Sequence, residues 1–241
     1  MKIIITSGGT REHIDNVRTL SNTSSGRLGQ LCAEAFAQSG YDVIYIHGVH
    51  AYIPNGDILK IPVEGVLDLE REMKAALMDP DVVGVIHAMA VSDYFVSSVS
   101  NFEQLANHIE NKTKKDVVHI LNTFEEHGFD RVHKIGSNES GLAVLLKPAP
   151  KIIPMIKDLR SDVILVGFKL LVDVSETELI DVGYKLLMKN HCDFVLANDL
   201  VNIKGDNHIG HLIQDDHTYK TFQTKQAIAA GLVAKISERV K

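Results

Sequence analysis

The sequence predicts an α/β fold, in which a Rossmann-like, mostly parallel sheet carries helices on both faces. Three observations support this prediction. Short β-branched runs alternate with amphipathic segments of helical length. The first apolar run leads through a loop rich in Gly, Ser and Thr into a helix, as in a βαβ unit. The 241 residues are 45% hydrophobic and 23% charged, which is enough for a sizeable core.

The order of the elements can be read along the chain. Strands are expected near residues 2–6, 42–46, 58–61, 82–88, 142–146, 163–167 and 194–197, and helices near 25–38, 66–78, 150–159 and 176–190. The first helix has an apolar stripe and ends at Ser39-Gly40, a common stop signal. Asp216-His217 are expected at the turn of a C-terminal hairpin, followed by a closing helix over 224–240.

Residues 97–133 interrupt the alternation of strands and helices. They have helical patterning but lie between the expected strands 82–88 and 142–146. We therefore interpret 1–241 as a single domain with an insertion at 97–133 that forms a lid or a subunit contact.

Composition excludes several classes of protein. A net charge of −6 argues against a nucleic-acid partner, which requires clustered Lys and Arg. The first apolar run has only three consecutive Ile, too few for a signal peptide or a membrane span, so a cytoplasmic protein is expected. Cys32 and Cys192 lie in apolar stretches without CxxC spacing and are expected to be reduced packing residues.

The loop after the first strand has the features of an anion site. Gly8 and Gly9 allow close approach of the backbone, and Ser24, Ser25 and Gly26 lie where the next helix begins. Helix capping by one serine is the simpler alternative. A dinucleotide site is disfavoured because G-x-G-x-x-G is absent, and because the second strand is followed by His47 and His50 instead of an acidic residue.

The pattern TSGGTRE-x-ID-x-VR-x-x-SN-x-SSG, which begins at Thr6, resembles that of phosphopantothenate-cysteine ligase, the phosphopantothenoylcysteine synthetase of coenzyme A biosynthesis. The resemblance continues, in the family's order, at AMAVSDY (88–94), HKI (133–135), LLKPAPKII (145–153), LVGF (165–168), KLLMKN (185–190) and LAND (196–199). It implies a stand-alone ligase without the flavin-dependent decarboxylase half, and therefore without flavin.

The resemblance implies the reaction and its partners. The carboxylate of 4′-phosphopantothenate attacks the α-phosphate of CTP or ATP, which is bound with Mg²⁺, and pyrophosphate is released. The amine of L-cysteine then attacks the acyl-nucleotidylate, which gives the amide and a nucleoside monophosphate. A homodimer is also implied. Neither a general base for the amine nor metal ligands can be identified from the sequence.

The resemblance assigns roles to individual residues. Asn22 contacts the activated acyl phosphate, and Lys134 belongs to a mobile loop that covers the triphosphate or the acyl intermediate, so these two are the catalytic candidates. The nucleotide is expected to bind at His87, Ala88, Met89, Asp93, Lys134, Ala149, Pro150, Lys151, Ile152, Ile153, Phe168, Lys185 and Lys189. The phosphate or substrate is expected to bind at Gly8, Gly9, Thr10, Arg18, Ser24, Ser25 and Gly26.

Each side chain also has a structural interpretation. Asn22 could be a turn residue and Asp93 a cap, whereas Lys185 and Lys189 could lie on a solvated helix face. Arg18 is a bidentate clamp for a phosphate or carboxylate, or an exposed arginine at a helix edge.

Two segments depart from the common bacterial pattern and look more like the eukaryotic ligases, which use ATP. They are Lys134-Ile135-Gly136-Ser137 and Gly167-Phe168-Lys169-Leu170-Leu171. We place CTP ahead of ATP. Two other functions stay open: an NAD(P)-dependent oxidoreductase, which lacks its glycine fingerprint here, and a non-catalytic nucleotide-binding subunit.

Overall fold

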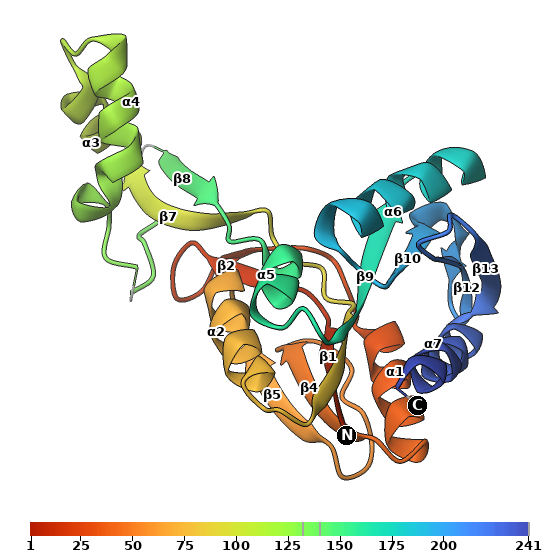
Figure 1. Ribbon diagram of the computed structural model, residues 1–241. Helices are drawn as coiled ribbons and strands as arrows, with labels where there is room; N and C mark the ends of the chain where they lie inside the picture. Colours follow the sequence, from red (N-terminus) through yellow and green to blue (C-terminus); the bar gives the residue numbers. More distant parts are fainter. Residues whose placement is uncertain (132, 140, 241) are drawn as a thin grey trace.

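The computed structural model describes residues 1–131, 133–139 and 141–240, and its main sheet confirms the predicted α/β class (Figure 1). Six parallel strands follow the order β5-β4-β1-β6-β9-β10, and an antiparallel set, β12 with β11 and β13, extends the β10 edge. The strands are β1 (Lys2–Ser7), β4 (Asp42–Gly48), β5 (Leu59–Val63), β6 (Val82–His87), β9 (Ile164–Leu171), β10 (Phe194–Asp199), β11 (Ile203–Lys204), β12 (Asn207–Ile213) and β13 (Tyr219–Thr224).

The core forms two layers because successive side chains of a strand point to opposite faces of the sheet. Ile4 packs in one layer, whereas Ile3 and Ile5 pack in the other, and all three are fully buried. The first layer contacts α2 (Val66–Leu77), α5 (Ile152–Leu159) and α6 (Glu176–Asn190), and the second contacts α1 (Arg27–Gln38) and α7 (Lys225–Arg239). Helices therefore cover both faces, as predicted.

The capping residues explain two of the boundaries. Ser175 accepts a hydrogen bond from Glu178 N at 3.2 Å at the start of α6, and the helix ends where His191 adopts a left-handed φ of 53°. The predicted C-terminal hairpin is confirmed as β12 and β13, with His217 in its turn at a φ of 64°.

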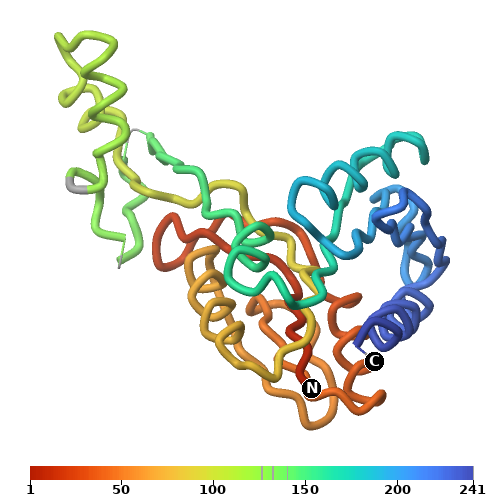
Figure 2. The backbone as a smooth tube through the Cα atoms, in the orientation of Figure 1, coloured from red at the N-terminus to blue at the C-terminus, as the bar shows by residue number. Residues whose placement is uncertain are grey.

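The segment between β6 and α5 forms an arm that extends away from the sheet (Figures 1 and 2). Its stem is an antiparallel pair, β7 (Tyr94–Asn101) and β8 (Leu142–Pro148), and beyond the stem lie α3 (Phe102–Ile109), α4 (Lys114–Thr123) and the short helix η1 (Phe124–His127). The strand expected at 142–146 exists, but it pairs with β7 and not with the main sheet. The arm also begins and ends outside the expected limits of 97 and 133.

The polar loop after β1 contains a short hairpin that the sequence did not indicate. Its strands are β2 (Arg11–His13) and β3 (Thr19–Ser21), and a further short helix, η2 (Leu200–Asn202), follows β10. Cys32 and Cys192 are buried and unpaired, as expected, and burial raises the pKa of each thiol to about 12. In the described residues, no helix combines the length and the apolar character that crossing a membrane requires.

Candidate active site

The candidate site lies where the loops after β1 and β6 meet. β4 and β6 flank β1 on opposite sides, so the strand order reverses here, which is the usual ligand position in such sheets. Ala90 N donates to Gly8 O at 2.8 Å, and Thr10 N donates to Ala90 O at 3.2 Å. Ser92 N donates a hydrogen bond to Thr10 Oγ1 at 2.8 Å. These bonds join the two loops into one floor for the site.

The start of α1 packs directly against this floor. Gly26 has a φ of 70°, and a Cβ added there would lie 2.9 Å from Gly8 N, so only glycine fits. Ser7 Oγ donates to Gly26 O at 2.9 Å. Ser25 Oγ accepts only a long 3.4 Å contact from Arg27 N. The N-cap residue is Gly26, which has no side chain to bond to the first helix amides. The helix terminus therefore keeps the open amides that anions favour.

Asn22 lies between β3 and α1, at a small cavity. Its Nδ2 donates to Val91 O at 3.0 Å, which ties the exposed side chain to the loop after β6. The cavity has a volume of about 110 Å³ and is lined by Gly9, Arg11, Ser21, Asn22, Ser24, His50 and Ala51. The structure thus brings together three predicted residues, Gly9, Asn22 and Ser24. Arg11 and His50 line the same cavity but received no role from the sequence.

Asp93 and the predicted 149–153 segment meet at the base of the arm. Asp93 Oδ1 lies 2.6 Å from Lys151 Nζ, and both side chains are exposed. Ala149 N donates to the Asp93 carbonyl at 2.9 Å. Ile152, however, is buried against α2 and α6 residues, so its side chain belongs to the core. The exposed carboxylate and ammonium of this segment form an ion pair with each other.

His87 ends β6 as a buried structural residue. Its Nδ1 lies 2.9 Å from Thr6 Oγ1, which also accepts a bond from Met89 N at 3.2 Å. Burial lowers the pKa of His87 to about 4. The imidazole is therefore neutral at pH 7, and the Thr6 hydroxyl that contacts it holds the backbone of Met89 in the loop after β6.

This buried histidine predicts a pH dependence of stability. Below about pH 6.5 the unfolded chain binds a proton that folded His87 does not bind, so the free energy of unfolding falls as the pH drops towards 4. We expect a loss of about 2 kcal/mol between pH 7 and pH 5 from this group. Urea unfolding at both values should show a smaller loss in His87→Gln than in the wild type. The exposed His119→Gln is the control, and an equal loss in all three proteins would contradict the prediction.

Phe168 lies in β9 beside the same edge. The residue before it, Gly167, pairs in register with His87, and Phe168 itself pairs with Leu196 of β10. The ring is half-buried and packs partly on the α1 and α7 layer. Its position beside the end of β6 is consistent with a role at a nucleobase.

Lys185 and Lys189 are exposed and lie in the second half of α6. This helix leads back to the start of β10, where Asp193 N donates to Leu165 O near the start of β9. Phe194, the first residue of β10, pairs with Val166 of β9, and Val166 pairs with Ile86 near the end of β6, so the end of α6 is level with the C-terminal half of the central strands. Among the described residues, no hydrogen bond connects the two lysines to the loops after β1 and β6, and their role in nucleotide binding stays a prediction.

Arg18 and Asp15 anchor the loop that carries Lys134. Arg18, predicted as an anion clamp, grips a carboxylate of its own chain: its Nε and Nη2 lie 3.0 and 2.5 Å from Asp15 Oδ2. This guanidinium holds the pKa of buried Asp15 well below its usual range. Ile135 N donates to Asp15 Oδ2 at 3.1 Å, and Ile135 O accepts from Arg18 Nη2 at 3.0 Å. Lys134 is exposed beside this anchor.

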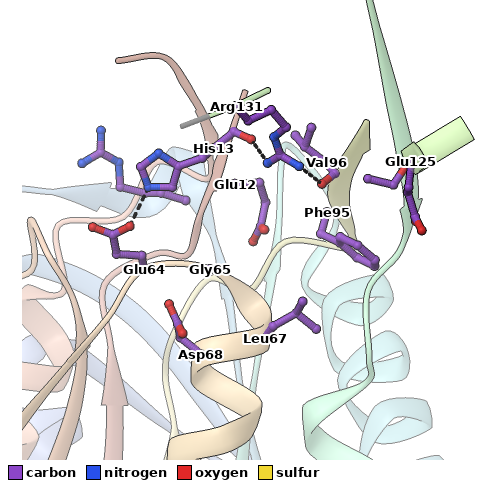
Figure 3. Close-up of a pocket in the computed structure, with 12 residues that line it drawn as sticks. Glu12, His13, Glu64, Gly65, Leu67, Asp68, Phe95, Val96, Glu125 and Arg131 are labelled. Carbon is purple, nitrogen blue, oxygen red and sulfur yellow. Dashed lines mark hydrogen bonds and ion pairs between the residues drawn. The ribbon is translucent and has the colours of Figure 1, made fainter. Parts of the chain in front are cut away.

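A second cavity, of about 440 Å³, separates the arm stem from the start of α2 (Figure 3). Arg131 lies above it and donates to the carbonyls of His13 and Val96, the latter at 2.9 Å, but its buried Nε has no partner among the described residues. Burial raises the pKa of Glu12, whose Oε1 accepts from Val66 N at 3.0 Å. The acidic residues in the lining are Glu12, Glu64, Asp68 and Glu125. No motif of the sequence predicts this cavity.

Comparison with known proteins identifies similar chains over the whole length. The family described as DNA/pantothenate metabolism flavoprotein C-terminal domain matches residues 1–128 and 125–240. The coenzyme A biosynthesis bifunctional protein CoaBC of Methanocaldococcus jannaschii is 29% identical over an alignment of 246 positions that covers 100% of this chain and 51% of the relative. Its counterpart in Thermococcus kodakarensis is 30% identical, over 98% of this chain and 51% of the relative. The chain therefore spans about half the length of these relatives.

Solved structures show the same fold. The DNA/pantothenate metabolism flavoprotein from Streptococcus pneumoniae is 34% identical, with a TM-score of 0.83 and coverage of 99% of both chains. A Cab2 mutant in complex with phosphopantothenate-cysteine is 19% identical, with a TM-score of 0.68 over 99% of this chain and 85% of that chain. At this identity the second likeness concerns the fold alone.

Proposed function

Because the chain belongs to the family of the DNA/pantothenate metabolism flavoprotein C-terminal domain, we propose that it is a phosphopantothenate-cysteine ligase of coenzyme A biosynthesis. The observation that carries the proposal is the cavity at the strand reversal, where Asn22, Gly9 and Ser24 of one sequence motif meet. The names of the relatives support the pathway.

In the first proposed step, a carboxylate oxygen of 4′-phosphopantothenate attacks the α-phosphorus of a nucleoside triphosphate. The bond from this phosphorus to the β-phosphate bridge breaks, and pyrophosphate leaves. Two anions must approach each other, so positioning and charge neutralisation dominate the barrier. The amides at the start of α1 and the exposed ammonium of Lys134 supply that neutralisation.

In the second step, the cysteine amine attacks the acyl carbon. The carbon–oxygen bond to the nucleotide breaks, the nucleoside monophosphate leaves and the amine loses a proton to solvent. Asn22 is suited to this step because a neutral amide can donate to the developing oxyanion without taking up or losing a proton. Its bond to Val91 O uses one N–H, and none of the described residues accepts a hydrogen bond from the other.

The nucleotide is proposed to lie between the loop after β6 and the start of α5. Asp93 would accept from ribose hydroxyls or the base edge, and Phe168 would flank the base. CTP is placed ahead of ATP. Mg²⁺ would travel with the triphosphate and keep several waters. The described residues contain no group of three His, Cys, Asp or Glu side chains placed to hold a metal ion. We further propose a cytoplasmic homodimer in which the arm is a lid or a subunit contact.

A release assay tests the proposal. Pure protein with 4′-phosphopantothenate, L-cysteine, Mg²⁺ and either CTP or ATP should release pyrophosphate, faster with CTP. Omitting 4′-phosphopantothenate is the control for nucleotide hydrolysis. Nucleotide binding without release from either triphosphate would instead indicate a non-catalytic binding subunit.

Lys185→Ala should weaken nucleotide binding more than it slows the chemical steps. The side chain is exposed, so its attraction to a triphosphate is screened and is worth about 1 kcal/mol, roughly fivefold in affinity. Calorimetric titration with CTP measures this change directly. Lys235→Ala, which removes a lysine from α7, is the matched control, and equal affinities in both variants would remove Lys185 from the proposed site.

A further inference from the structure

Arg11 is a cation at the candidate site that has no carboxylate partner among the described residues. Its Nη1 lies 2.6 Å from His50 Nε2, and its Nη2 donates to Thr19 Oγ1 at 3.2 Å. Arg18, by contrast, is neutralised by Asp15. Of the two arginines in the opening motif, Arg11 is therefore the one whose charge is available to a ligand.

The contact between Arg11 Nη1 and His50 Nε2 indicates the tautomer of the imidazole. Arginine has only donors, so Nε2 must be the acceptor, and the neutral ring carries its proton on Nδ1. The ring thus orients the guanidinium and keeps a second donor, Nδ1–H, for which the described residues provide no partner. Together the two side chains offer several N–H groups next to Asn22.

The cavity that these residues line suits one small anion. Its lining contains Arg11, His50, Asn22 and two serines but no carboxylate, although the chain as a whole has a net charge of −6. The larger cavity also touches Arg11, but it carries four acidic residues. A volume of about 110 Å³ is well below the roughly 300 Å³ or more of a site that encloses a whole small molecule. It has room for one anionic group, while the rest of the ligand lies outside.

We propose that Arg11 and His50 bind a phosphoryl group of the substrate beside Asn22. The guanidinium presents N–H donors in a fork that matches phosphoryl oxygens, and the histidine adds one more donor. The group comes from either of two sources: the α-phosphate of the nucleotide or the phosphate of 4′-phosphopantothenate. The identity of these ligands rests on the proposed function, whereas phosphoryl binding itself requires no turnover.

Calorimetric titrations with CMP, 4′-phosphopantothenate and inorganic phosphate test this site. Arg11→Gln should bind at least one of the two organic ligands about tenfold more weakly or worse, because it loses charge-assisted hydrogen bonds. A loss confined to CMP assigns the nucleotide phosphate, and a loss confined to 4′-phosphopantothenate assigns the other source. Arg71→Gln, which removes an exposed arginine from α2, should bind both as the wild type does.

His50→Ala gives a second measurement at an exposed position, where a folding defect is not expected. It should weaken the same ligand by about threefold or more, since it removes one donor and frees Arg11 to move. Wild-type affinity for both organic ligands in Arg11→Gln and in His50→Ala would overturn the inference. If the wild type nevertheless releases pyrophosphate, the phosphoryl site at Arg11 and His50 is wrong and the ligase proposal stands. If Arg11→Gln loses phosphoryl binding while the wild type releases no pyrophosphate, the site stands and the ligase proposal fails.

Discussion

Replacing Asn22 with alanine should lower turnover by more than tenfold and leave the fold intact. A tenfold loss corresponds to about 1.4 kcal/mol of transition-state stabilisation, and removal of a single oxyanion donor can cost about a hundredfold or more. The side chain is exposed and makes one described hydrogen bond, to Val91 O, so little of the stability depends on it. Steady-state pyrophosphate release, together with a thermal melt, measures both expectations.

Two further variants sharpen this prediction. Asn16→Ala removes an exposed asparagine from the same stretch and should keep full activity. Asn22→Asp keeps the shape but adds a negative charge beside the acyl phosphate, so it should be at least as slow as Asn22→Ala. A wild-type rate in Asn22→Ala would remove this residue from the reaction even if the ligase activity were real.

Lys134→Ala should slow the first step by more than tenfold, because an exposed ammonium that closes over the triphosphate offsets the charge of two approaching anions. Pyrophosphate release in the absence of cysteine reports on this step alone. The anchoring of Ile135 by Asp15 and Arg18 does not involve the Lys134 side chain, so the loop should keep its position in the variant.

Lys134→Arg should recover part of the activity, since it retains the charge but not the shape of the ammonium. Lys74→Ala removes an exposed lysine from α2 and is the matched control. If Lys134→Ala released pyrophosphate as fast as Lys74→Ala without cysteine, the lysine would have no part in nucleotide activation.

The fold could be predicted where local patterns determine the structure. The bounds of α6 agree with the expected 176–190, because the Ser175 cap and the apolar periodicity define both ends. Strand β8 was expected at about the right place, yet its partner is β7, since strand pairing depends on distant residues that the local pattern does not contain. The hairpin of β2 and β3 was missed because three residues per strand, most of them polar, are too few for a periodic signal.

The site could be predicted where its residues belong to a single sequence motif. The family resemblance is confirmed by the match over both halves of the chain, and Gly9, Asn22 and Ser24 do meet in one cavity. Arg11 received no role because its partner His50 lies 39 residues away. Likewise, the sequence suggested Arg18 as a ligand clamp because it does not show that Asp15 is folded against the Lys134 loop.

The most direct test of the proposed mechanism is to trace the two carboxylate oxygens of 4′-phosphopantothenate into the products. If this carboxylate attacks the α-phosphorus, substrate labelled with oxygen-18 in both carboxylate positions must transfer one labelled atom to the nucleoside monophosphate and leave the other in the amide carbonyl. Mass spectrometry of the two products should therefore find one heavy oxygen in each. A nucleoside diphosphate as the product, with the label in inorganic phosphate instead, would indicate an acyl phosphate and would contradict activation as an acyl-nucleotidylate.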